Sequence, residues 1–197
     1  MINHSVTEQK QAMTLESNEG NTNAATYVTS DLPEWIAAME HTPARKTHRK
    51  LKVVPMPFNL AVLDANGADG VQGRFPAVRR WILMGHSLGG VMAAGYLDGH
   101  AQSWDGLVLL GAHSTADLSD DGVTVLSVTG DSDGVLDRRA AADNGGNLGE
   151  DARELVIPGG NHAQFGSYGP QDGDGEASLS PEEQRALVAD EVAGVFL

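Results

Sequence analysis

Three short polar segments carry residue types that together could perform nucleophilic catalysis. The first contains Ser87, the second contains Asp131 and Asp133, and the third contains His162. A serine hydroxyl is a poor nucleophile until a neutral histidine takes its proton, and a carboxylate on the other ring nitrogen fixes the tautomer of that histidine. These three residue types, each on its own loop, therefore predict acyl transfer through a covalent intermediate.

The serine lies at the apex of a predicted strand–turn–helix unit. An apolar run at residues 81–84 is followed by the sequence GHSLGG, and residues 88–97 suit a helix. Gly85 and Gly89 remove side chains that would collide in so sharp a turn, and glycine tolerates the unusual dihedrals that such a turn requires. An ordinary turn serine is the alternative interpretation. The surrounding pattern favours an exposed nucleophile.

The candidate acid and base each follow a predicted strand. Both aspartates belong to the sequence TGDSDG after the strand at residues 123–128, and His162 belongs to GGNH after the strand at residues 154–157. In an open parallel sheet, reactive groups lie on the loops that follow the carboxyl ends of strands. The structural alternatives are a turn aspartate and a loop histidine, because D-S-D-G sequences are common in turns.

Strands and helices alternate along most of the chain. Further strands are predicted at residues 51–54 and 107–110, a weak helix at residues 64–80, and a helix that begins at Pro181. Ser180 and Glu183 form a capping-box pattern at the start of that last helix. The alternation predicts an α/β fold with a doubly wound, mostly parallel sheet.

Three segments resemble the alpha/beta-hydrolase superfamily, in particular a small bacterial and archaeal subfamily without a lid domain. They are MPFNLA at residues 56–61, GHSLGG at 85–90, and GGNHAQFG at 159–166, which YGP follows at 168–170. The resemblance implies a lidless alpha/beta-hydrolase fold and a serine hydrolase that needs no cofactor. It further implies a small-molecule ester or related acyl compound as the substrate.

The resemblance also implies a role for each candidate residue. Ser87 corresponds to the nucleophile and His162 to the base, and the backbone N–H of Leu88 corresponds to one oxyanion donor. The acid of this superfamily lies three residues after a glycine that ends its strand. Counting from Gly130 gives Asp133, and Asp131 remains the alternative.

The first quarter of the chain departs from the family pattern. Residues 1–50 are expected to be an atypical or truncated, largely disordered or loosely packed segment, with a short helix at 31–40, and residues 51–197 are expected to form the hydrolase core. The family places a glycine-rich oxyanion loop before the strand at 51–54, and residues 1–50 contain no such motif. Loss of one oxyanion donor costs roughly 100- to 1,000-fold in turnover. A degenerate, non-catalytic relative with an incomplete oxyanion hole is therefore the alternative function.

Charge is distributed unevenly along this acidic chain. The net charge is −14, and residues 53–197 contain 21 acidic residues against seven arginines and no lysine. Numerous short carboxylates favour a surface that stays hydrated in concentrated salt, where repulsion is screened. We interpret this composition as halophilic, and an ordinary acidic cytoplasmic enzyme is the alternative. Either interpretation argues against nucleic acid as a partner, because nucleic acid requires a basic face.

Composition also narrows the remaining classes of function. The absence of cysteine excludes disulfides and thiolate chemistry, and no apolar run is long enough to span a membrane or serve as a signal peptide, so a cytoplasmic location is expected. The histidines lack metal-ligand spacing, and no metal site is predicted. The acidic segments at residues 131–137 and 172–176 lack the EF-hand spacing, so solvated loops are favoured over cation binding.

Overall fold

The computed structural model describes residues 12–13, 24–28, 52–53, 66, 68–76, 78–167 and 169–196. The predicted helix at residues 31–40, the MPFNLA motif at 56–61 and Tyr168 lie outside the described residues. So does most of the segment that was expected to be loosely packed.

One seven-stranded sheet organises the described residues, in the order β1-β3-β2-β4-β5-β6-β7. The strands are β1 (Ala12–Met13), β2 (Ala24–Val28), β3 (Lys52–Val53), β4 (Arg80–His86), β5 (Gly106–Leu110), β6 (Thr124–Gly130) and β7 (Arg153–Ile157). Strand β1 pairs antiparallel with β3, and every other neighbouring pair is parallel. The predicted α/β class with a mostly parallel sheet is confirmed.

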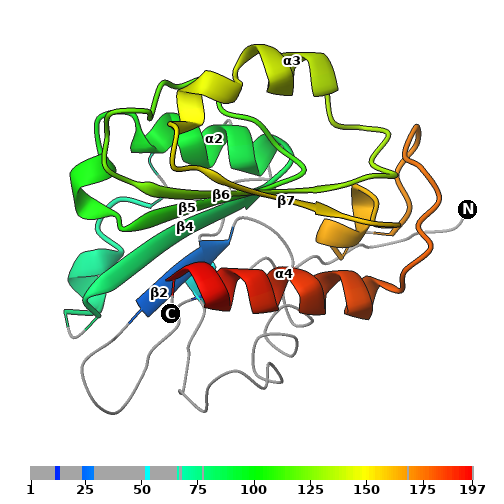
Figure 1. Ribbon diagram of the computed structural model, residues 1–197. Helices are drawn as coiled ribbons and strands as arrows, with labels where there is room; N and C mark the ends of the chain where they lie inside the picture. Colours follow the sequence, from blue (N-terminus) through cyan, green and yellow to red (C-terminus); the bar gives the residue numbers. More distant parts are fainter. Residues whose placement is uncertain are drawn as a thin grey trace, which may run out of the picture.

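Helices cover both faces of this sheet (Figure 1). The α-helices are α2 (Leu88–Leu97), α3 (Arg138–Asp143) and α4 (Pro181–Phe196), and the short 3₁₀ helices are η3 (Gln72–Arg74), η4 (Ala101–Ser103), η5 (Gly145–Leu148) and η6 (Ala163–Phe165). Helices α2 and α3 lie on one side of the sheet and α4 on the other. Among the described residues, no helix combines the length and the apolar character that crossing a bilayer requires.

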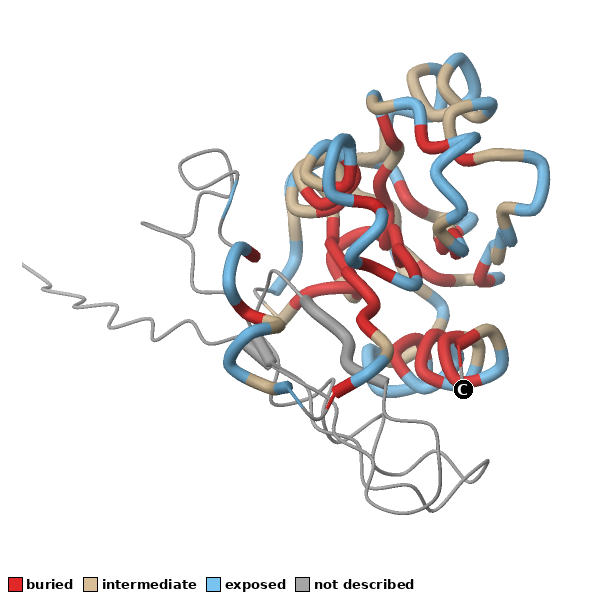
Figure 2. The backbone as a smooth tube through the Cα atoms, turned by 90° about the vertical axis from the view of Figure 1, so that its left-hand side faces the viewer, coloured by how far each residue is buried: buried red, intermediate tan, exposed pale blue. Residues whose placement is uncertain are grey.

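Alternating side chains of the central strands build two cores. On β4, Ile82 and Met84 belong to the core that contains Val188 and Val192 of α4. Their neighbours Trp81 and Leu83 belong to the core on the α2 side. Because successive side chains of a strand point to opposite faces, a continuous apolar strand fills both layers. Figure 2 shows these buried stretches at the centre of the described chain.

Helix α4 begins as its sequence predicts. The backbone N–H of Ser180 donates to Oε2 of Glu183 at 2.8 Å, and the backbone N–H of Glu183 donates to Oγ of Ser180 at 3.2 Å. This reciprocal pair is a capping box, which satisfies N–H groups that have no partner inside the helix. The boundary of the helix is thus set by local chemistry.

Two segments differ from the sequence-based expectation. Residues 24–28 were expected to be loosely ordered, yet they form β2, which pairs with β4 along all five residues. Its sequence, AATYV, lacks a clear period, so pairing with its neighbours determines the strand. The predicted helix at 64–80 is wrong for its described part, where turns and η3 occur. Gly70 and Gly73 have low helix propensity, and Pro76 lacks the N–H that a helical hydrogen bond requires.

Candidate active site

Ser87 occupies a strained turn between β4 and α2. Its dihedrals are φ 53° and ψ −127°, and it is the one non-glycine residue with positive φ in the described part of the chain. A Cβ added at Gly85 would lie 2.6 Å from the Cα of Gly90, which shows how closely strand and helix approach. The predicted strand–turn–helix unit is therefore present, and its glycines are required by contact.

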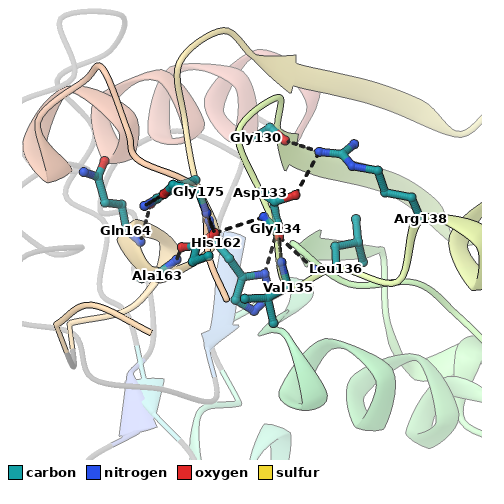
Figure 3. A network of polar contacts seen from close by, with 12 residues as sticks. Gly130, Asp133, Gly134, Val135, Leu136, Arg138, His162, Ala163, Gln164 and Gly175 are labelled. Atoms are coloured by element: carbon teal, nitrogen blue, oxygen red, sulfur yellow. Dashed lines mark hydrogen bonds and ion pairs between the residues drawn. The ribbon is translucent and has the colours of Figure 1, made fainter. Parts of the chain in front are cut away.

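Asp133 and His162 form a buried pair. Oδ2 of Asp133 accepts a hydrogen bond from Nδ1 of His162 at 2.8 Å, and the two side chains are at most 1% exposed. Oδ1 of Asp133 accepts from the backbone N–H groups of Val135 at 2.9 Å and Leu136 at 2.8 Å (Figure 3). Burial raises the pKa of Asp133, but hydrogen bonds from His162, Leu136 and Val135 outweigh it, so the pKa lies below its usual value.

The three candidate residues converge at the carboxyl end of β5. The backbone N–H of Ser87 donates to the carbonyl of Leu110 at 3.0 Å. At the next residue, Gly111, an added Cβ would lie 2.8 Å from Nδ1 of His162 and 3.1 Å from Oδ2 of Asp133. One strand end therefore contacts both the serine turn and the Asp–His pair.

The second ring nitrogen of His162 is left without a partner. Its Nε2 atom is buried and makes no hydrogen bond to any described group, Ser87 included. With Nδ1 bonded to Asp133, Nε2 is the ring atom that can take a proton from an incoming group. In this arrangement Asp133 orients the ring of His162 through Nδ1, and Nε2 remains available to accept a proton.

Asp131, the alternative acid, has a different environment. It is exposed, and its Oδ1 accepts from the backbone N–H of Gly159 at 2.8 Å and from Oγ of Ser132 at 3.0 Å. These bonds connect the two loops at their bases. Asp133 is the aspartate that contacts His162.

Arg138 is a supporting residue that sequence analysis did not identify. One guanidinium nitrogen donates to the backbone carbonyls of Gly130 at 3.0 Å and Asp133 at 3.1 Å (Figure 3). It also donates to the carbonyl of Asp131 at 3.2 Å. It therefore fixes the turn that presents Asp133. No motif marks this arginine, because its partners are backbone oxygens that any sequence would supply.

One carboxylate of the acidic segment after His162 departs from the predicted solvated loop. Asp172 and Glu176 are exposed, whereas the carboxylate of Asp174 accepts hydrogen bonds from loop N–H groups, His162 among them. Within the described ranges, no group of three or more His, Asp or Glu could hold a metal ion. The sequence shows three carboxylates close together, and only the folded loop shows that Asp174 is the one that accepts hydrogen bonds from it.

Leu88 is the first residue of α2 and is exposed. Its N–H belongs to the first turn, where helical N–H groups have no carbonyl four residues earlier. It lies next to Ser87 and is suited to stabilise negative charge that develops at that position. It is the one candidate oxyanion donor that the sequence analysis names among the residues that the structure describes.

Strand β2, which pairs with β4, ends beside the turn that carries Ser87. Val28, at the carboxyl end of β2, is paired with Met84, three residues before Ser87. Because β2 and β4 are parallel, their carboxyl ends lie at the same edge of the sheet. The chain therefore leaves β2 at the edge that carries Ser87.

Comparisons of the sequence with family models and of the structure with solved structures both find similar proteins. A sequence model of the alpha/beta hydrolase family matches residues 36–186. Among solved structures, Est1E from Butyrivibrio proteoclasticus is similar with a TM-score of 0.61 and 12% identity, covering 92% of each chain. No curated protein matches the sequence at a significant level.

Two further structures have a similar fold. An alpha/beta hydrolase enzyme from a sediment metagenome of the Mar Chica lagoon, Morocco, has a TM-score of 0.59 and 17% identity, covering 98% of this chain and 99% of its own. A thermophilic esterase from Thermogutta terrifontis has a TM-score of 0.57 and 11% identity, covering 94% of this chain and 97% of its own.

Proposed function

Because the chain belongs to the alpha/beta hydrolase family, we propose that it is a serine hydrolase that cleaves ester or related acyl substrates through an acyl-enzyme. Ser87 is the nucleophile, His162 the general base and acid, and Asp133 the residue that orients the imidazole. The backbone N–H of Leu88 is one donor to the oxyanion. Structural relatives described as esterases support the choice of an ester.

The proposed reaction begins at the hydroxyl of Ser87. His162 Nε2 takes the hydroxyl proton while Oγ forms a bond to the acyl carbon, and the carbonyl oxygen becomes an oxyanion near the N–H of Leu88. Collapse of this intermediate breaks the bond to the leaving oxygen, which takes the proton from His162. Water then attacks the acyl-enzyme with His162 again as base, which releases the acid and restores Ser87.

The buried contact between Asp133 and His162 is the observation that carries the proposal. A 2.8 Å bond at Nδ1 leaves Nε2 as the proton acceptor, and that nitrogen has no competing partner among the described residues. The carboxylate stabilises the imidazolium that forms when the base accepts a proton.

Covalent labelling with a fluorophosphonate probe tests this function directly. The wild-type protein should be labelled and should hydrolyse p-nitrophenyl acetate or butyrate. Ser87→Ala should abolish both, because no other group at the turn can attack. Labelling that persists in Ser87→Ala would refute the assignment. A folded wild-type protein that is neither labelled nor active would instead support the degenerate, non-catalytic alternative.

A further inference from the structure

The carboxylate of Asp174 connects the candidate acid loop with the candidate base loop. Its Oδ1 accepts from the backbone N–H groups of Gly134 at 3.1 Å, His162 at 3.2 Å and Gly175 at 2.9 Å. Its Oδ2 accepts from the backbone N–H of Ala163 at 2.8 Å. Four N–H groups from three segments thus meet one side chain, and hydrogen bonds to an ionised acceptor are stronger than neutral ones.

Three of the four donors lie next to the Asp–His pair. Gly134 directly follows Asp133 in the chain, and two further bonds come from His162 itself and its neighbour Ala163 (Figure 3). Apart from the direct 2.8 Å contact between Asp133 and His162, Asp174 therefore provides a second connection between the two residues. Because its bonds are to backbone N–H groups, Asp174 fixes the backbone positions from which the side chains of Asp133 and His162 extend.

Glycines allow the Asp174 segment to approach this closely. A Cβ added at Gly134 would lie 3.1 Å from the backbone nitrogen of Gly175, and one added at Gly175 would lie 3.0 Å from the carbonyl carbon of Ser132. Both distances are below ordinary contact. The loop is packed against the acid turn by backbone contact, and it is held from the other side by Asn161, whose Nδ2 donates to the carbonyl of Gly175 at 2.8 Å.

We propose that Asp174 is a positioning residue that holds Asp133 and His162 at their productive distance. It contacts neither reacting atom, and it acts through the backbone N–H groups of Gly134, His162 and Ala163. A displacement of about 1 Å at a reacting group can cost on the order of 100-fold in rate. The catalytic consequence rests on the proposed function, whereas the geometric role does not.

An amide in place of the carboxylate removes this function with little change in shape. In one rotamer of Asp174→Asn, the amide oxygen takes the Oδ1 position and keeps the bonds from Gly134, His162 and Gly175, but the NH₂ group then faces the N–H of Ala163. In the flipped rotamer, the oxygen keeps the bond from Ala163 and those three bonds are lost. We expect kcat to fall by about 10- to 100-fold, up to the cost of displacing a reacting group by about 1 Å. KM should stay within a few-fold, because Asp174 does not line the reacting atoms.

Asp172→Asn is the matched control. It removes the same charge from the same segment, but Asp172 is exposed, and its side chain makes no hydrogen bond or ion pair with a described residue. It should therefore leave kcat and KM unchanged. Equal kcat in wild type, Asp174→Asn and Asp172→Asn would overturn the proposal.

A proton NMR measurement tests the geometric role without enzyme activity. The Nδ1 proton of His162, shared with Asp133, should give a resolved downfield resonance in wild type and in Asp172→Asn. In Asp174→Asn it should move or disappear through exchange with water. An unchanged resonance would overturn the proposal even if no substrate is ever hydrolysed.

Amide hydrogen exchange of the wild-type protein covers the case in which Asp174→Asn does not fold. The amides of Gly134, His162 and Ala163 lie in loops, yet they should exchange slowly because Asp174 accepts their bonds. Slow exchange at all three supports the proposal. Fast exchange at these positions, with slow exchange in β4 and β5, contradicts it.

Discussion

The ring of His86 lies against the ring of His162, with centroids 4.6 Å apart and planes inclined by 48°. His86 is 5% exposed, and it occupies the position directly before Ser87. Burial first, and the neighbouring His162 second, lower the pKa of His86 to about 3. A neutral ring therefore supports one side of the candidate base, and it cannot compete for protons there at neutral pH.

This neutral histidine predicts a specific acid sensitivity. His86 has a pKa of 6.5 when unperturbed and about 3 when folded, so between those values the unfolded chain binds a proton that the folded protein does not. The contribution of His86 therefore lowers the free energy of unfolding as pH decreases below 6.5. From pH 7 to 5 this one group accounts for at most about 2 kcal/mol.

Replacement of the ring isolates that contribution. We expect His86→Gln to reduce the loss of stability between pH 7 and 5 relative to wild type, whatever its absolute stability at pH 7. Urea unfolding at both pH values measures the difference. Equal losses in the two proteins would show that His86 is protonated in the folded state.

The two candidate acids can be separated by matched substitutions. Asp133→Asn replaces the carboxylate that bonds Nδ1 of His162, and an amide there favours the wrong imidazole tautomer. We expect kcat for p-nitrophenyl butyrate to fall by up to about 10⁴-fold.

Asp131→Asn is the control for that experiment, because Asp131 bonds Gly159 and Ser132 rather than the imidazole. It should change stability slightly and kcat little. The reverse order of effects would transfer the orienting role to Asp131. Comparable melting temperatures for both variants ensure that kcat reports chemistry rather than folding.

Gly111 offers a test of how tightly the Asp–His pair is enclosed. It has φ +52°, and an added Cβ would lie 2.8 Å from Nδ1 of His162. Gly122 has φ +70° and nothing within 4 Å of an added Cβ. An L-residue in the left-handed region costs roughly 1–2 kcal/mol, so Gly122→Ala measures backbone strain alone.

We expect Gly111→Ala to destabilise the protein by more than Gly122→Ala and to lower kcat as well, because the methyl group displaces His162 or Asp133. Thermal unfolding and turnover of both variants measure the two effects. Wild-type kcat in a folded Gly111→Ala protein would mean that the pair tolerates displacement. That outcome would weaken the role assigned to its geometry.

Sequence reasoning succeeds here where local chemistry determines the outcome. The turn at Ser87 requires glycine, the start of α4 requires a capping residue, and buried strands such as Leu107–Leu110 are continuously apolar. Each pattern is confined to a few neighbouring residues. The preference for Asp133 over Asp131 came from the family resemblance instead, and Asp133 is the aspartate that contacts His162.

The features that were missed depend on contacts between distant segments. Strand β2 exists because β4 and β3 pair with it, and Arg138 and Asp174 act on backbone atoms that leave no trace in residue type. Two acidic residues of one loop, Asp172 and Asp174, are equivalent in sequence and differ only in direction. Such roles become visible once the partner loops are placed.

The charge distribution leads to a prediction about salt. Residues 53–197 carry 21 acidic residues and seven arginines, so like charges repel across the folded surface. The screening length falls from about 10 Å at 0.1 M salt to about 3 Å at 1 M. We therefore expect the melting temperature to rise with KCl, steeply at first and then more gradually.

The adjacent exposed residues Asp120 and Asp121 allow this cause to be tested on one surface site. Replacing both with Asn removes two repelling charges without removing a recorded side-chain bond, so the double variant should be more stable than wild type in low salt. The advantage should shrink in molar KCl, because screening already weakens that repulsion in the wild-type protein. A melting temperature that is flat or falls with KCl would contradict the halophilic interpretation. A rise with KCl that is identical in the double variant would show that repulsion at this surface site does not contribute to the salt effect.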